Sequence, residues 1–412
     1  MRDRQAVLAG DARVTALQGR LLWQVAILGG AVTLVFALAI LARAYAAASE
    51  AGSGAISVDF RVFWAAARLA WGGEPLAVFD QARLAAAHGV NTDAWMPWLY
   101  PPGYLALLMP LGGLSFLAAF LTSTLLSIGA IAAATRPFVA GSGAVWLAVV
   151  LAPACLPALL IGQNSLFWLA GLLAAVAALR AERWVLAGIC IGCLTLKPHL
   201  GLMIPVALVA AGHWRTIFAA GATAVLLAVL PTLDFGPEYW PLLLAAMQEQ
   251  GQRLLGSIGD LPLMVGPFYL FTLVGLPPGA ALAGQWLIAA LAAVGLFLIW
   301  RSPRAGADLQ GAALLIAILL SAPYLWYYET AMMPLIGLFL LRAGVLPPRP
   351  LPLALLALLW LGAGPQAIGV FTGLADPRLL GAVIVTPVLL ACLVLAVLHA
   401  TRGLRSPAEV TP

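Results

Sequence analysis

Long apolar runs separated by short polar stretches fill the chain from Leu21 to Ala400. A helix needs about 20 apolar residues to cross the hydrocarbon core of a bilayer. We place about twelve such helices, transmembrane or re-entrant, at residues 21–46, 104–135, 143–161, 165–179, 184–196, 199–212, 216–232, 280–300, 309–322, 330–342, 350–366 and 379–400. The pattern predicts an all-α polytopic membrane protein.

Some of these runs are short for a full crossing. The two runs on either side of Lys197 hold about 13 residues each, or about 20 Å of helix. Non-helical backbone at membrane depth is tolerated only where protein buries it or a cavity is formed. We therefore expect a re-entrant hairpin around Lys197, and within 104–135 a short dip followed by a full span.

Two polar segments, 47–103 and 233–279, are too long to be simple turns. The first contains VFWAAARLAWGGEPLAVFDQARLAAAHG, which predicts two short amphipathic helices around the turn signal GGEP. Its Trp and Phe residues suit the membrane interface. Long loops on a rigid scaffold usually carry function, so this first loop is the leading place for a site.

The composition agrees with this class of protein. Hydrophobic residues make up 63%, charged residues 9%, and the mean hydropathy is +1.02. The net charge of +5 does not indicate nucleic-acid binding, because the basic residues lie singly between apolar runs and form no patch. We interpret them as topology signals.

Cytoplasmic loops hold an excess of Lys and Arg. With the N-terminus inside, fourteen of the 21 Lys and Arg residues lie inside and eleven of the 16 Asp and Glu residues lie outside. Residues 1–20 and 401–412 are then cytoplasmic tails, 21–400 is the membrane domain, and the loops 47–103 and 233–279 are periplasmic. We expect a multi-pass protein of the bacterial inner (plasma) membrane with its active site facing the periplasm.

Asp59, in SVDFRVFW, lies where the chain first leaves the bilayer, two residues before Arg61. Ionisable groups near hydrocarbon are usually kept for function. The alternative is that Asp59 caps an interfacial helix beginning near Phe60, for which aspartate is a favoured residue. The two roles can coexist.

Lys197, in CLTLKPHLG, stands beside Pro198 and His199 between two apolar stretches and is the sole lysine of the chain. A cation at the outer end of two short helices can hold a phosphate, with His199 as a further donor. The alternative is a snorkelling lysine that ends a span.

Three further segments combine aromatic, amide or acidic side chains near the outer surface: WLYPPGYLALLMPLG, LIGQNSLF and SAPYLWYYE. Their amides and aromatic rings could bind a sugar, or could satisfy helix ends and form the interfacial aromatic belt. The candidate substrate-binding residues are Tyr100, Gln163, Asn164, Tyr324, Tyr328 and Glu329.

The four cysteines lie within apolar spans and indicate no disulfide framework. Cys190 and Cys193 form a C-x-x-C without a second pair. No H-E-x-x-H, P-loop or dinucleotide fingerprint occurs. We expect neither a metal nor a cofactor.

The segments DFRVFWAAARLAWGGEPLAVFD, WLYPPGYLALLMPLG, GQNSLFWLAGLLAA, AGICIGCLTLKPHLGLMIPV and SAPYLWYY, in this order, resemble glycosyltransferase family 87 over roughly residues 21–400. The resemblance implies a GT-C fold, a polyprenyl-phosphate sugar donor and transfer on the non-cytoplasmic side. It implies that Asp59 is the base and that Lys197 matches the basic residue of the K-P segment. One departure is LWYYE, where relatives often carry a His/Asp-containing stretch, and Glu329 could replace the missing carboxylate.

The resemblance therefore favours a metal-independent hexosyltransferase that moves mannose to a lipid or glycan acceptor with inversion. A lipid phosphate is a good leaving group, so one base, Asp59, suffices while Lys197, with Arg61 or His199, stabilises the phosphate. The rival is a polytopic transporter or lipid flippase, although no paired broken segments occur in two matching halves. A third possibility is another membrane transferase or ligase that uses a lipid-phosphate donor.

Overall fold

The computed structural model describes residues 2–16, 23–24, 26–35, 38, 59–88, 96–257, 263–347, 349–372 and 380–402. Its regular secondary structure in these ranges is helical, and the β pairing there is one isolated antiparallel bridge between Met264 and Trp326. The prediction of an all-α membrane protein is confirmed for this part of the chain.

The helices follow one another along the chain with short connections. The first half contains α1 (Arg2–Ala16), α3 (Phe60–Trp71), α4 (Gln81–His88), α5 (Pro102–Leu108), α6 (Phe116–Thr135), α7 (Gly143–Val150), α8 (Leu156–Ile161), α9 (Ser165–Arg180), α10 (Trp184–Cys193) and α11 (Ile204–Ala211). The second half contains α12 (Trp214–Phe235), α13 (Tyr239–Ser257), α14 (Pro267–Leu273), α15 (Pro278–Arg301), α16 (Ala307–Ser321), α17 (Met333–Ala343), α18 (Pro350–Leu361), α19 (Gly364–Thr372) and α21 (Ala382–Arg402).

Fewer of these helices are long enough to cross a membrane than the hydropathy pattern indicates. Among the described residues five qualify by length and composition, and a sixth is possible if the bent pair α18 and α19 forms one span. The five are Phe116–Phe138, Gly143–Ile161, Trp214–Phe235, Pro278–Arg301 and Ala382–Thr401. Several other expected spans form apolar helices of 10–17 residues, including Ser165–Arg180 and Ala307–Ser321. The number of about twelve stays a prediction.

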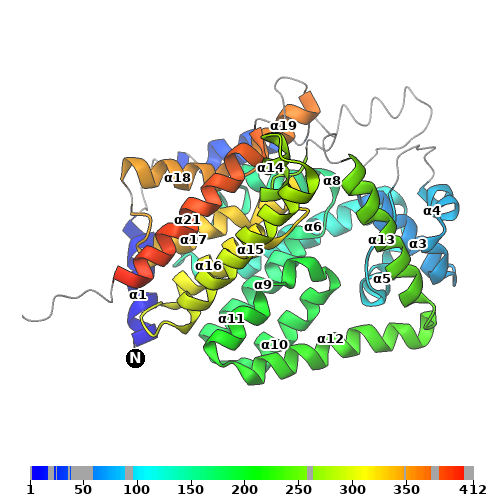
Figure 1. The fold of residues 1–412 in the computed structure, drawn as a ribbon, viewed down its shortest axis with the longest axis horizontal. Coiled ribbons are helices and arrows are strands. Elements are labelled where there is room, and N and C mark those ends of the chain that lie inside the picture. The colour runs from blue at the N-terminus through cyan, green and yellow to red at the C-terminus, as the bar shows by residue number, and fades with distance from the viewer. Residues whose placement is uncertain are drawn as a thin grey trace, which may run out of the picture.

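Helix α16 forms the centre of the molecule. Nearly all of its residues are buried, as expected for a helix that is apolar on every side. It packs against α15, α17, α21 and α1, and α15, α16 and α21 run side by side in Figure 1. This arrangement fixes where the two ends of α16 lie relative to its neighbours.

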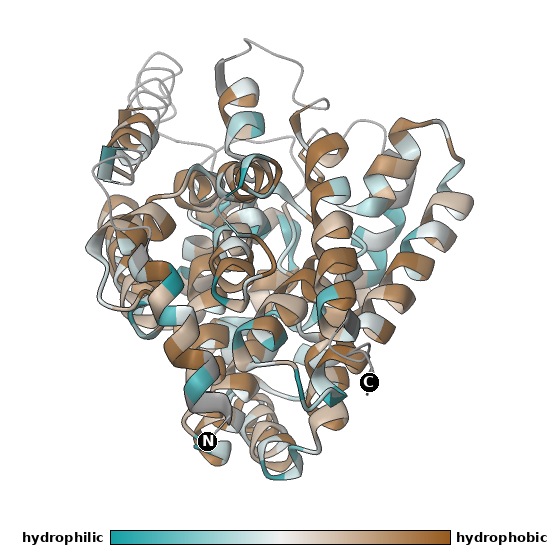
Figure 2. Ribbon diagram, turned by 90° about the vertical axis from the view of Figure 1, so that its left-hand side faces the viewer, coloured by the Kyte–Doolittle hydropathy of each residue, from teal (hydrophilic) through white to brown (hydrophobic). Residues whose placement is uncertain are grey.

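The outer helices instead expose apolar side chains. Much of the ribbon of these helices has the brown colour of hydrophobic residues in Figure 2. On α12, Phe218 is 75% exposed and Leu233 is 78% exposed. α10 packs closely on α12. This close approach needs glycine at 188 and 192, because a Cβ at either position would clash with α12. These glycines form the G-x-x-x-G spacing that lets membrane helices approach each other. α12 therefore presents a surface suited to lipid.

Three central helices each carry polar groups at both ends. Helix α9 begins beside Asn164 and ends at Arg180, and α17 begins four residues after Glu329 and has Arg342 in its last turn. Helix α16 begins beside Asp308 and ends just before the segment that carries Glu329. A 15-residue helix such as α16 is about 22 Å long. The fold therefore holds two polar clusters at opposite ends of the same helices.

Candidate active site

Asp59 stands at the start of the amphipathic helix α3, within the first long loop. Its carboxylate does not cap α3, since no hydrogen bond joins its side chain to the helix end. Instead its Oδ2 accepts a hydrogen bond of 2.7 Å from Nε2 of Gln163, 104 residues further along the chain. The carboxylate therefore does not cap α3 but contacts the turn between α8 and α9.

Gly162 makes this contact possible. It ends α8 with φ at +68°, a left-handed conformation that glycine adopts without strain. A Cβ at this position would lie 2.6 Å from Cβ of Phe60, so a larger residue would push the turn away from α3. The glycine thus lets Gln163 reach Asp59 at the start of α3.

Lys197 lies in a break between the short 3₁₀ turns Leu194–Leu196 and Pro198–Gly201, beyond the end of α10. Its side chain is 3% exposed. The Nζ donates hydrogen bonds to Oδ1 of Asn164 at 3.1 Å and to Oγ of Ser165 at 3.5 Å. It also forms an ion pair of 2.5 Å with Oε1 of Glu329. Lys197 is therefore a buried cation and does not snorkel to the surface.

Glu329 belongs to the 3₁₀ turn Tyr327–Met332, which leads into α17. The preceding backbone is fixed by an extended pairing, in which Val265 donates its N–H to the carbonyl of Leu325 at 2.8 Å. Next to Glu329, the ring of Tyr328 lies with its centroid 5.0 Å from Nζ of Lys197, a cation–π contact. Carboxylate and ring thus hold the lysine from one side.

Tyr100 and Tyr104 form another wall of the site. Their ring centroids are 4.8 Å apart, and both rings pack edge-on against Phe63 of α3. Tyr104 forms a hydrogen bond with the side chain of Asn164. Burial, together with nearby Tyr104, Asp59 and Glu329, raises the pKa of the Tyr100 phenol. Tyr100 therefore stays protonated and can donate a hydrogen bond.

The site combines two carboxylates, Asp59 and Glu329, with one lysine. Loss of hydration on burial raises the pKa of Asp59, and the Gln163 hydrogen bond and the Lys197 charge partly oppose that rise. A carboxylate with a raised pKa is a better proton acceptor than an ordinary one. The environment therefore suits Asp59 to general-base chemistry.

Two buried oxygens at the site have no hydrogen-bond donor among the described residues: Oε1 of Gln163 and Oε2 of Glu329. Buried acceptors in native proteins are nearly always satisfied, and exceptions call for an explanation such as a missing ligand. Both oxygens need a donor, and hydroxyl groups of a sugar supply such donors. The arrangement can therefore receive a polyhydroxylated substrate.

The structure does not bring every expected residue into this cluster. Arg61 donates from Nη1 to the carbonyl of His88 at 2.9 Å and lies over the ring of Phe116. It follows Asp59 by two residues, and residues two apart on a helix face different sides. His199 is exposed, unlike Lys197, and Tyr324 packs against Phe268 beside α14. The donor-binding roles of Arg61 and His199 and the sugar-binding role of Tyr324 stay predictions.

Ser165 and Tyr104 are site residues that the sequence reasoning missed. Both lie inside segments already singled out, one residue after Asn164 and four residues after Tyr100. Tyr104 lies on α5, whereas Tyr100 lies in the segment before the helix, which Pro101 keeps extended. No helical spacing therefore relates the two rings, and only their place in one aromatic segment could have indicated Tyr104.

The fold and the site define a class: an all-α membrane protein with a buried acid, amide and lysine cluster at one end of its central helices. The family model described as "Glycosyltransferase family 87" matches residues 98–326, more than half of the chain. The chain therefore belongs to glycosyltransferase family 87, and the resemblance noted from its motifs is confirmed.

The matched range includes Tyr100, Gln163, Asn164 and Lys197, whereas Asp59 and Glu329 lie outside it. No curated protein and no solved structure matches the chain. Family membership makes the protein a membrane glycosyltransferase. The contacts described above connect the two acidic residues to the matched core.

Proposed function

We propose that the protein transfers a hexose, with mannose as the first candidate, from a polyprenyl-phosphate donor to a lipid or glycan acceptor. Transfer takes place on the periplasmic side of the bacterial inner membrane and inverts the anomeric centre. The proposal includes the GT-C fold for the membrane domain. The observation that carries it is the Asp59 carboxylate held by Gln163 in the same cluster as the buried Lys197.

Asp59 is the base in this mechanism. The acceptor hydroxyl gives its proton to the Asp59 carboxylate while the acceptor oxygen forms a bond to the anomeric carbon. The bond between that carbon and the phosphate oxygen breaks, and its electron pair leaves with the polyprenyl phosphate. One displacement on one face of the sugar gives inversion.

Lys197 stabilises the leaving phosphate. Its charge acts on Asp59 in the described site, and a charge-assisted bond to phosphate oxygen is stronger than a neutral one. The ion pair with Glu329 keeps the lysine oriented before the donor binds. The phosphate then competes with Glu329 for the same ammonium.

The unpartnered oxygens of Gln163 and Glu329 accept hydrogen bonds from sugar hydroxyls. Sites that bind a hydroxyl through buried polar groups reject analogues lacking that hydroxyl, because those groups are then left unpaired. Tyr100, which keeps its phenolic proton, adds a donor on the other side. This set of groups favours a sugar over an apolar lipid headgroup.

The test is transfer of labelled mannose from polyprenyl-phosphate mannose by the purified full-length protein in lipid nanodiscs. We expect Asp59→Asn to lower kcat by about 10²- to 10⁴-fold, the usual contribution of general-base catalysis. The matched control is Asp80→Asn, the same substitution on the same loop at an exposed residue that caps α4. The control should retain full transfer.

A folded Asp59→Asn protein that transfers at the normal rate would rule out this base. A parallel sample with a chelator tests the metal-independent mechanism, for which we expect unchanged transfer. If the wild type forms no glycosylated product from mannose, glucose or arabinose donors but moves the donor across the bilayer, the flippase alternative replaces the transferase.

A further inference from the structure

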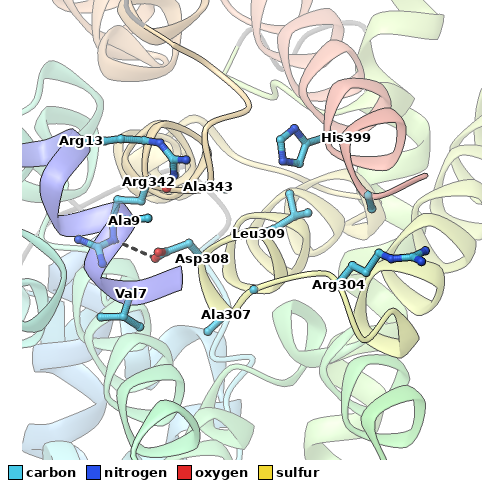
Figure 3. Close-up of a pocket in the computed structure, with 12 residues that line it drawn as sticks. Val7, Ala9, Arg13, Arg304, Ala307, Asp308, Leu309, Arg342, Ala343 and His399 are labelled. Carbon is cyan, nitrogen blue, oxygen red and sulfur yellow. Dashed lines mark hydrogen bonds and ion pairs between the residues drawn. The ribbon is translucent and has the colours of Figure 1, made fainter. Parts of the chain in front are cut away.

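A cavity lies at the end of the central helices opposite the candidate active site. It has a volume of about 310 Å³ and is bounded by α1, by the segment from Arg304 into α16, and by the ends of α17 and α21 (Figure 3). Its charged lining residues are Arg13, Arg304, Arg342 and Asp308, with His399 beside them. Among its charged lining residues, arginines therefore outnumber the aspartate.

The charges around this cavity do not balance. Asp308 is engaged by Arg180 and Arg342, and Asp11 is engaged by Arg342 as well. Among the described residues, Arg13 and Arg304 form no ion pair, while Nη1 of Arg13 donates to the carbonyl of Arg342. Four arginines thus face two aspartates, and two positive charges are left over.

Two buried donors in the cluster have no hydrogen-bond partner among the described residues, Nε of Arg180 and Nη2 of Arg342. Nη2 of Arg342, whose side chain is 0% exposed, is buried and makes no hydrogen bond among the described residues. Buried charged donors are normally paired. The cavity therefore offers the unsatisfied Nη2 of Arg342, whose Nε and Nη1 are bonded, together with the exposed side chains of Arg13 and Arg304.

The position of the cavity indicates what kind of anion it holds. Arg304 follows the end of α15 by three residues, and His399 lies in the last turn of α21, which ends at Arg402. Both helices are long and apolar enough to cross a membrane, so their ends lie at the depth of lipid headgroups. The remaining lining is mainly apolar, including Val7, Leu309 and Ala400.

We propose that this cavity binds the phosphate of an anionic glycerophospholipid in the leaflet that faces α1. Basic pockets between membrane helices are suited to such headgroups. The phosphate contacts Arg13 and Arg304, and the glycerol and upper acyl carbons pack on the apolar lining. The site is separate from the glycosyl-transfer site and does not depend on the proposed function.

The test is titration of the detergent-purified full-length protein with phosphatidylglycerol or phosphatidylcholine of identical acyl chains, with bound lipid counted by native mass spectrometry. Both arginines are exposed, so Arg13→Gln/Arg304→Gln should still fold. We expect the double variant to lose about twenty-five-fold in phosphatidylglycerol affinity, or about five-fold for each arginine. Phosphatidylcholine should bind weakly to both proteins.

The matched control is Arg183→Gln/Arg215→Gln, which removes two exposed arginines outside the cavity and should leave binding unchanged. Equal affinity of the wild type for the two lipids would overturn the proposed lipid site. An equal loss of phosphatidylglycerol affinity in both double variants would overturn it as well. Inorganic phosphate is titrated in a further arm. Displacement of the lipid by inorganic phosphate at similar concentration would identify a soluble anion as the ligand and overturn the lipid assignment.

Discussion

The two ends of helices α9, α16 and α17 carry buried charges of opposite balance. Among the described residues, two carboxylates face one lysine at the end near Asp59, and two buried acceptor oxygens lack donors there. At the other end of the described helices, arginines outnumber aspartates, and two buried donors lack acceptors. The same helices therefore join a site that needs hydrogen-bond donors to a site that needs an anion.

This contrast shows that buried ion pairs alone do not identify function. Both ends contain them, and a buried pair is weak evidence for stabilisation because desolvation offsets the Coulomb attraction. The informative difference lies in which groups stay unsatisfied and how they are positioned. Unpaired oxygens beside a potential base fit a sugar, whereas spare arginines at span ends fit a lipid phosphate.

Removing Lys197 should cause the largest loss of stability and transfer at the active-site end. Lys197→Met leaves Glu329 buried without its cation, and we expect a loss of about 3–5 kcal/mol in the free energy of unfolding. Transfer should fall about 10²- to 10³-fold because the leaving phosphate loses its stabilising charge. Thermal unfolding in nanodiscs and transfer assays measure the two effects.

The double variant Lys197→Met/Glu329→Gln separates these effects. It removes both charges, so stability should return toward wild type while transfer stays low. Recovery of transfer in the double variant would show that Lys197 acts only by neutralising Glu329.

Arg342→Met should destabilise the opposite end without impairing the chemistry. The substitution removes contacts to Asp11 and Asp308, but Asp308 retains Arg180, so the expected loss is about 3 kcal/mol, at the lower end for a broken buried pair. The transfer rate per folded molecule should not change. The exposed Arg349→Met is the control and should alter stability by less than about 0.5 kcal/mol. A lowered kcat in folded Arg342→Met would show that the two ends are functionally coupled.

The smallest expected change comes from Gln163→Leu, which leaves all charges in place and removes the hydrogen bond to Asp59 and the amide oxygen proposed to contact the sugar. That bond favours the ionised carboxylate and so lowers the pKa of Asp59, which burial has raised. Its loss should raise this pKa further. Because the base must be ionised, transfer falls as pH drops through that pKa, and the acidic limb of the pH profile should move to higher pH.

The kcat/KM of both proteins measured from acidic to mildly alkaline pH checks this shift, and above the acidic limb the variant should show only a constant loss, which reports the missing sugar contact to Oε1 of Gln163. Glu249→Ala, at an exposed ion pair on α13, is the control, and the acidic limb of its pH profile should lie at the same pH as in the wild type. An unshifted limb in Gln163→Leu would show that Asp59 is not the titrating group.

Much of the fold can be predicted from local sequence. The helix around 60–71 and the break at Lys197 follow from amphipathic spacing and from proline, both of which act over a few neighbouring residues. The lengths of the spans could not be predicted as well. The predicted run 165–179 agrees with α9, but the run 143–161 is broken between α7 and α8 around Pro153, and hydropathy does not register that break.

The candidate residues were also visible in the sequence, but their grouping was not. The sequence alone determined the class of protein, through its apolar runs, and singled out Asp59, Lys197 and Glu329 as charged groups placed against hydrophobic surroundings. Only the tertiary structure decided that Gln163 holds Asp59, that Lys197 pairs with Glu329, and that Arg61 faces away. The physical reason is that hydropathy and helix spacing are local properties, whereas the first two contacts join residues more than 100 positions apart and all three depend on how the helices pack.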